Sequence, residues 1–115
     1  FDVVWAGNFV DQGWFKKQEE MNAKRWIFDG DLACKSFAYV AEKAPNVDAY
    51  LINGMCNFIS EVDGLPERPV HLETKLEAML GKPLVGHDTA LYWRIMKHLG
   101  IAPTTEQGKL LRSLK

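Results

Sequence analysis

Short apolar runs alternate with helix-like patterns along this chain, and this alternation restricts the folds that it can adopt. Residues 1–5, 49–52 and 83–86 are rich in β-branched, aromatic or aliphatic side chains, as short strands are. Amphipathic stretches separate these runs and follow the last one. The order predicts an α/β fold in which helices flank a parallel sheet. Ligands of such sheets bind outside the carboxyl ends of the strands.

Apolar residues at helical spacing predict four helices in the part of the chain after residue 30. Their apolar positions are Ala33, Phe37, Val40 and Ala44; Leu72, Leu76, Met79 and Leu80; Leu91, Ile95 and Leu99; and Leu110, Leu111 and Leu114. An aspartate in the run 29–31 is suited to cap the first of these helices, and Asp88 or Thr89 is suited to cap the third. Gly81 suits the left-handed end of the second helix.

The remaining stretches have weaker patterns. Residues 11–26 predict a loop followed by a helix, and the prolines and glycine of residues 58–69 predict a loop. Residues 104–107 have the spacing of a capping box ahead of the last helix. A sheet of three strands would leave both edges open, so we expect a strand and a helix to be missing at the amino end. The lack of an initiator methionine likewise suggests a processed chain or a piece of a longer one.

Composition places the chain among ordinary soluble domains. Hydrophobic residues make up 47% and charged residues 25% of the 115 residues, which is enough for one small core. The net charge of −1 gives no reason to expect binding to nucleic acid or to an anionic membrane. No apolar run approaches the ~18 residues that span a bilayer. Two cysteines do not make a disulfide framework, so a reducing, cytoplasmic compartment is expected.

The residues that follow the predicted strand at 49–52 are chemically useful, and they are expected at the carboxyl edge of the sheet, where ligands bind. These residues are Asn53, Gly54, Met55, Cys56 and Asn57. A glycine turn lets a ligand approach the backbone closely, and successive amides in such a turn hold a carboxylate or a phosphate. The same amides favour the thiolate form of Cys56, which makes Cys56 a candidate acid, base or nucleophile. A small buried cysteine is the alternative interpretation.

A second turn, at residues 86–89, is expected at the same edge. Its His87 stands just before a predicted helix, where the helix dipole favours anions, so it is a candidate to bind a carboxylate or to move a proton. A solvated His87 beside a capping Asp88 or Thr89 is the alternative. Cys34 lies on a core-facing helical stripe and is expected to be buried and structural. The sequence has no zinc-ligand spacing and no phosphate-binding glycine loop.

Three stretches carry a resemblance to a known family. They are Tyr50-Leu51-Ile52-Asn53-Gly54-Met55-Cys56, the run from Leu72-Glu73 to Leu80-Gly81-Lys82-Pro83-Leu84-Val85, and the run from Ala90-Leu91-Tyr92-Trp93 to Leu99-Gly100-Ile101. Together they resemble the second lobe of the aspartate/glutamate racemase superfamily, in its maleate isomerase and arylmalonate decarboxylase branch. The resemblance covers roughly residues 29–101. In the simplest register the cysteine of the family falls near Gly54, two residues before Cys56, so both positions stay open as the catalytic one.

The resemblance implies one incomplete lobe of a two-lobe α/β fold at residues 1–101 and a helical tail at residues 102–115. It implies a racemase, isomerase or decarboxylase that acts on a small carboxylic or dicarboxylic acid, with no metal and no organic cofactor. Cys56 is then the catalytic residue, and a missing first lobe or a second chain is the expected partner. The residues expected to bind the substrate are Asn53, Gly54, Met55, Asn57 and His87. A non-catalytic α/β module that binds a small anion or a partner chain is the alternative.

Overall fold

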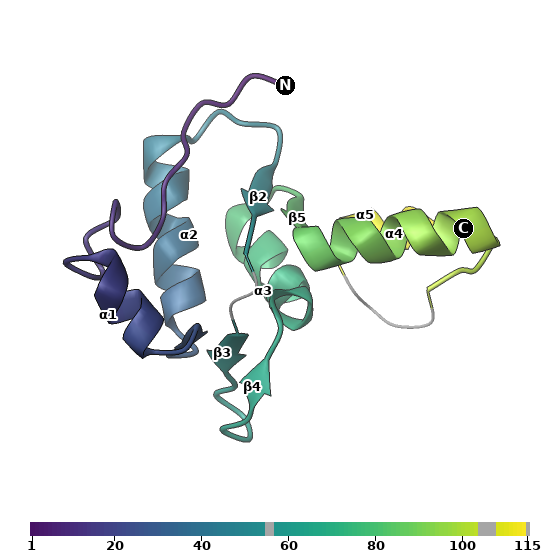
Figure 1. Cartoon of the computed structure of the whole chain (residues 1–115). Helices are drawn as coiled ribbons and strands as arrows, with labels where there is room; N and C mark the ends of the chain where they lie inside the picture. The colour runs from purple at the N-terminus through teal and green to yellow at the C-terminus, as the bar shows by residue number, and fades with distance from the viewer. Residues whose placement is uncertain (55–56, 104–107, 115) are drawn as a thin grey trace. The chain divides into compact units, whose positions relative to one another are not determined.

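The computed structural model describes residues 1–54, 57–103 and 108–114, and Figure 1 shows their course. Within these residues the chain is a small α/β protein with five helices, one mixed sheet and one parallel pair of strands. The chain divides into two compact units. Unit 1 comprises Phe1–Val47 and Met55–Glu67, and unit 2 comprises Asp48–Gly54 and Arg68–Lys115. The expected division into a lobe and a tail at residue 101 stays a prediction.

Unit 1 combines two helices with a three-stranded mixed sheet. Its elements are α1 (Gln18–Ala23), β1 (Ile27–Phe28), α2 (Leu32–Lys43), β3 (Asn57–Ile59) and β4 (Pro66–Glu67). Strands β1 and β3 are parallel, with Phe28 opposite Phe58, and β3 pairs antiparallel with β4. Both phenylalanines are buried, and their ring centroids lie 6.2 Å apart. The centre of the sheet is therefore part of an aromatic core.

Two sequence-based expectations for unit 1 are wrong. Residues 1–5 do not form a strand, and residues 1–4 are exposed, because this β-prone run pairs with no other strand in the described chain. The predicted loop at residues 58–69 instead contains most of β3 and all of β4. Gly64 has a left-handed conformation (φ 72°) in the turn between these two strands. Pro66 is tolerated because β4 is the edge strand of the sheet.

Helix α2 buries the predicted stripe, but its expected side-chain cap is absent. Ala33, Phe37 and Ala44 are buried, as the helical spacing predicts. Asp31 occupies the N-cap position without a capping hydrogen bond from its side chain. Its carboxylate pairs with Lys35 one turn later, so the ion pair replaces the predicted cap.

Cys34, also on α2, is half-buried, whereas the sequence predicted a buried side chain. The difference arises because Cys34 lies at the border of the stripe, beside the buried Ala33. Its thiol is free, in agreement with the prediction that the two cysteines form no disulfide. The predicted position of Cys56 near residues 86–89 lies outside the described residues.

Unit 2 contains the parallel pair of strands and three helices. Its elements are β2 (Tyr50–Ile52), α3 (Pro69–Leu80), β5 (Leu84–Gly86), α4 (His87–Leu99) and α5 (Lys109–Arg112). Tyr50 lies opposite Leu84 and Ile52 lies opposite Gly86, which confirms the predicted parallel pairing. The expectation that β2 is central is wrong for the described residues, where β5 is its one partner. Leu84 is fully buried and anchors the pair in the core of unit 2.

The helix ends of unit 2 agree with the sequence better than the helix starts do. Gly81 ends α3 and Gly100 ends α4 in left-handed conformations (φ 66° and 67°). The N-cap of α4 is Gly86, so Asp88 and Thr89 lie inside the first turn and do not cap the helix as predicted. The predicted capping box at residues 104–107 lies outside the described residues. Of the described helices, none is long and apolar enough to cross a bilayer.

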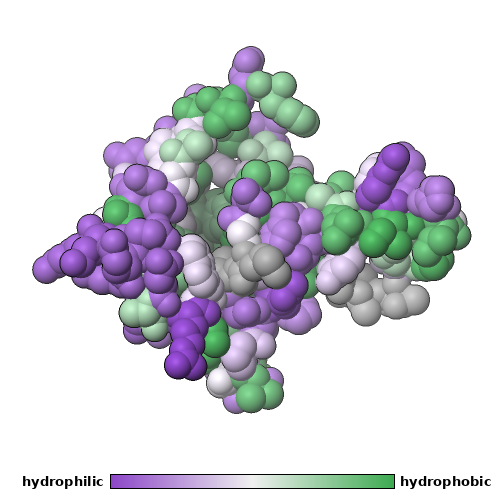
Figure 2. Space-filling model, in the orientation of Figure 1, coloured by the Kyte–Doolittle hydropathy of each residue, from purple (hydrophilic) through white to green (hydrophobic). Residues whose placement is uncertain are grey.

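The apolar face that the sequence predicted on α4 is exposed to solvent. Leu91, Ile95 and Leu99 follow one another at i, i+4 spacing and are 57%, 46% and 61% exposed. Figure 2 shows hydrophobic side chains on the surface over this helix. The buried residues of α4 are instead Asp88 and Thr89, so the helix enters the core by its polar first turn.

Candidate functional site

The parallel pairing of β2 and β5 brings the beginnings of the two predicted turns to one edge of unit 2. Because Ile52 lies opposite Gly86, Asn53 and His87 each follow directly from a paired residue at the carboxyl end of its strand. Gly54 comes next, with a φ of 133° that favours glycine. This edge is the place where ligands of parallel sheets bind.

The structure does not place the other three predicted site residues at this edge. Met55 and Cys56 lie outside the described residues. Asn57 opens β3 in unit 1, where its backbone N–H donates a hydrogen bond to the carbonyl oxygen of Trp26 at 2.8 Å. Of the predicted set, unit 2 therefore presents Asn53, Gly54 and His87 together.

Three polar side chains, those of Arg68, Asp88 and His87, contact one another at the start of α4. Arg68 Nε donates to Asp88 Oδ2 at 3.0 Å, and His87 Nε2 lies 3.0 Å from Asp88 Oδ1. Asp88 is buried, whereas Arg68 and His87 are partly exposed. One buried carboxylate therefore orients two side chains that reach solvent.

This arrangement suits both proton transfer and anion binding. A neutral imidazole that donates through Nε2 to a carboxylate keeps Nδ1 as a proton acceptor, and the carboxylate fixes its orientation. Arg68 is held through Nε, and guanidinium groups bind carboxylates through pairs of N–H donors. His87 is therefore placed as a candidate base, and Arg68 as a candidate ligand for an anion.

Glu73 on α3 supports this edge from the core. It is 0% exposed, and its Oε1 accepts hydrogen bonds from Gly86 N–H at 3.2 Å and from the Thr89 hydroxyl. Its Oε2 is buried and has no hydrogen-bond partner in the described residues. Burial raises the pKa of Glu73, and the two hydrogen bonds offset this only in part. Glu73 thus ties α3 to residues on both sides of His87.

Glu77, one turn later on α3, binds a second set of backbone amides. It is 4% exposed, and its Oε1 accepts from Leu84 N–H at 3.0 Å. Lys109 N–H donates to both carboxylate oxygens, at 3.0 Å and 2.9 Å. Arg112 approaches Glu77 Oε2 at 3.5 Å. Glu77 therefore joins α3, β5 and α5, which is a structural role.

Sequence reasoning missed this polar group because charged residues on a helix are ordinarily exposed. The available signal is weak. Glu73 and Glu77 are four residues apart, and each follows a leucine of the predicted stripe, Leu72 or Leu76. Both pairs are buried, so the buried face of α3 is wider than its apolar stripe. Arg68 lay in a segment interpreted as a loop, and no pattern connected it to α4.

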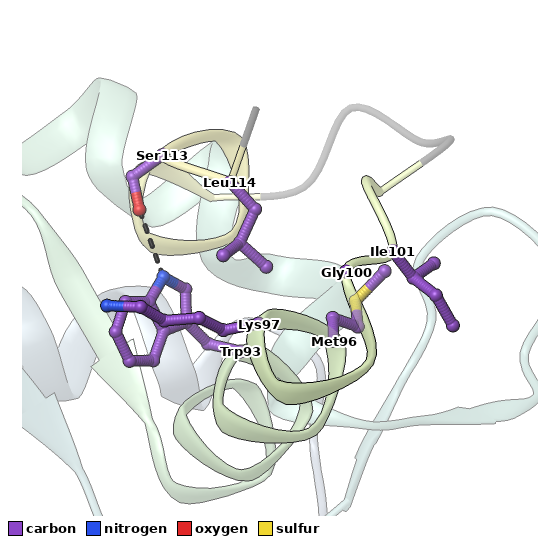
Figure 3. Close-up of a pocket in the computed structure, with 7 residues that line it drawn as sticks. All are labelled: Trp93, Met96, Lys97, Gly100, Ile101, Ser113 and Leu114. Atoms are coloured by element: carbon purple, nitrogen blue, oxygen red, sulfur yellow. Dashed lines mark hydrogen bonds between the residues drawn. The ribbon is translucent and has the colours of Figure 1, made fainter.

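A groove of about 350 Å³ lies between α4 and α5, away from His87. Its lining residues are Trp93, Met96, Lys97, Gly100, Ile101, Ser113 and Leu114 (Figure 3). Trp93 Nε1 donates to Ser113 Oγ at 3.1 Å, and Lys97 Nζ lies 4.4 Å from the centre of the Trp93 ring. These polar groups contact one another, and the lining of the groove presents polar and apolar groups in similar measure.

Neither metal binding nor family membership assigns a function to the edge. In the described part of the chain, no group of three or more His, Cys, Asp or Glu side chains is arranged to hold a metal ion. No protein-family model matches the chain, and no curated protein matches it. The chemistry of Arg68, Asp88 and His87 at the strand ends is therefore the basis for a functional proposal.

Proposed function

We propose that unit 2 binds a small carboxylic acid at the carboxyl edge of β2 and β5, as part of a cofactor-independent racemase, isomerase or decarboxylase. In this proposal Cys56 exchanges a proton with the substrate carbon or attacks it as a thiolate. Donors at the edge hold the substrate carboxylate and stabilise a carbanion-like state. The observation that carries the proposal is the pairing of Ile52 with Gly86, which gives Asn53 and His87 a common edge in unit 2.

The charges at this edge support a carboxylate as the ligand. Arg68 and His87 are basic, and both already contact the same buried acid, Asp88. Asp88 therefore fixes their positions in advance, which reduces the entropy that binding costs. Asn53 is exposed and adds a neutral amide donor at the end of β2.

Arg68→Gln is expected to weaken the binding of malonate about tenfold or more. The expected size follows from the ~1.5–3 kcal/mol that a hydrogen bond to a charged group contributes. Malonate is a suitable probe because it is the simplest stable dicarboxylate with an activated carbon. Its affinity for the whole chain can be measured from the backbone amide NMR shifts of Asn53, Gly54 and His87.

Arg94→Gln is the matched control for this experiment. Arg94 is exposed on the same helix as His87, and the substitution removes the same charge. It is expected to leave the affinity nearly unchanged, because isolated surface charges contribute little. Equal losses in the two variants, or saturation without a shift at Asn53 and His87, would contradict the proposed site.

A non-catalytic module that binds a partner chain is the second candidate function, and the exposed face of α4 favours it. Leu91, Ile95 and Leu99 present an apolar stripe that the described residues leave accessible. Apolar stripes of this spacing are the usual contacts between helices of two chains. The neighbouring groove between α4 and α5 adds a concave surface of mixed polarity.

Under this second function, Ile95→Glu is expected to abolish association. If a second copy of the chain covers the stripe, the native mass of the wild-type protein is about twice 13.1 kDa. The native mass of the Ile95→Glu variant is then 13.1 kDa, because burying the new charge in an apolar contact is unfavourable. Val62→Glu is the control, since Val62 is 97% exposed in unit 1 and belongs to no stripe on α4. Light scattering after gel filtration measures both masses. A wild-type mass of 13.1 kDa would rule out self-association at the concentration used.

A further inference from the structure

The surroundings of Glu73 disfavour a charged carboxyl group. The residue is 0% exposed, and its Oε2 has no hydrogen-bond partner in the described residues. Two glycines close over the group. A Cβ atom at Gly108 would lie 2.6 Å from Oε2, and a Cβ atom at Gly86 would lie 2.8 Å from Oε1. A side chain at either position would therefore displace the carboxyl group from its present place, and glycine lets the backbone lie close to both oxygens.

The charged groups around Glu73 do not compensate a charge on it. In the described chain, six other titratable or charged residues belong to the polar cluster around Glu73. They are Arg68 at the N-cap of α3, Glu77 on α3, His87 and Asp88 on α4, and Lys109 and Arg112 on α5. Arg112 approaches Glu77, while Arg68 and His87 contact Asp88. Lys109 contributes its backbone N–H to Glu77, and no described residue forms an ion pair with Glu73. An ionised Glu73 would thus be unpaired and close to two other acids.

We propose that Glu73 is uncharged in folded unit 2 and acts as a pH-dependent switch for the start of α4. When neutral, Glu73 keeps α3 bonded to Gly86 N–H and to the Thr89 hydroxyl. When its proton passes to water, the side chain becomes a buried carboxylate with one unbonded oxygen. Rotation of the carboxylate to solvent relieves that cost and breaks both hydrogen bonds. The proposal does not involve Cys56, so it can fail or succeed independently of the proposed enzymatic function.

The direction of the pH effect follows from the raised pKa of Glu73. The folded chain binds this proton more tightly than the unfolded chain does. The stability that Glu73 contributes is therefore complete below the ordinary glutamate pKa. This stability is lost as the pH rises from the ordinary glutamate pKa through the raised pKa of folded Glu73. Above the raised pKa, Glu73 causes no further loss of stability.

Glu73→Gln is expected to remove this component of the pH dependence. The amide has nearly the same shape, and its oxygen can accept the same two hydrogen bonds, but it does not ionise in this range. The urea midpoint of the wild-type chain should fall as the pH rises through the raised pKa, relative to the midpoint of the variant. Glu77→Gln is the matched control, because it changes a buried glutamate on the same helix. It should keep most of the fall, because Glu73 remains and its burial is the main cause of its raised pKa.

Carbon-13 NMR of the Glu73 carboxyl in the unsubstituted chain tests the proposal without a variant. The carboxyl signal is expected to titrate above the ordinary glutamate range, and the amide signals of Gly86 and Thr89 should move with the same midpoint. A Glu73 titration at or below the ordinary value overturns the proposal. Parallel pH profiles of stability for wild type and a folded Glu73→Gln variant overturn it as well.

Discussion

Replacing Glu77 with alanine is expected to lower the free energy of unfolding by about 3 to 5 kcal/mol, the range for breaking a buried charged contact. The carboxylate accepts hydrogen bonds from the backbone N–H groups of Leu84 and Lys109, and alanine leaves both donors without it. Leu84 is fully buried, so water cannot replace the lost acceptor there. The cavity left by the missing atoms adds to the loss. Urea unfolding of the whole chain measures the total effect.

Amide hydrogen exchange shows whether the loss arises at the predicted contact. In Glu77→Ala, the Leu84 and Lys109 amides should lose protection before the amides of unit 1 do. Glu77→Gln should cost less, because its carbonyl oxygen can still accept from Leu84 N–H. Glu42→Ala, an exposed position on α2, is the control for loss of a helical glutamate. If Glu77→Ala is no more destabilising than Glu42→Ala, Glu77 does not join α3 to β5 and α5.

The parts of the fold that local chemistry determines were predictable from the sequence. The parallel pairing of β2 with β5 follows from two short apolar runs separated by a helical pattern. The ends of α3 and α4 follow from Gly81 and Gly100, because glycine takes the left-handed conformation with little strain. The common edge at Asn53 and His87 follows from these two features together.

The parts that depend on distant backbone groups were not predictable. Glu73 and Glu77 are buried because β5, α4 and α5 present N–H or O–H donors to them, and these donors come from residues 84–109. Met79 belongs to the apolar stripe of α3 in the sequence but is exposed, because the buried face is shifted toward the glutamates. The spacing of apolar residues predicts which face of a helix is apolar. It does not predict which acidic side chains accept hydrogen bonds from distant parts of the chain.

The candidate site was predictable in position and not in composition. The sequence indicated His87, but it assigned Asp88 to a helix cap, because an acid in the first turn ordinarily binds free backbone amides. In the structure the Asp88 carboxylate instead contacts Arg68 and His87, and Gly86 occupies the N-cap position. The pairing of Arg68 with Asp88, twenty residues apart, required the packing of α3 beside α4.

Cys56→Ser is expected to reduce turnover of small dicarboxylates by about 10² to 10⁴-fold, the range typical of removing a general acid or base. A serine hydroxyl is far less acidic than a thiol, so it cannot exchange a proton with a carbon acid near neutral pH. The substitution is nearly isosteric, so the fold should be retained. The measurement compares turnover of a panel of malonate-like and maleate-like acids by the wild-type and variant proteins.

The second cysteine of the chain provides the control for this experiment. Cys34 is a half-buried free thiol on α2 in unit 1, and Cys34→Ser is expected to leave turnover unchanged. Loss of turnover in Cys56→Ser alone assigns the chemistry to Cys56. Equal turnover by wild type and Cys56→Ser would exclude Cys56 and leave the register in which Gly54 holds the catalytic position. Because glycine has no side chain to carry a proton, that outcome favours the anion-binding or partner-binding module over the enzyme.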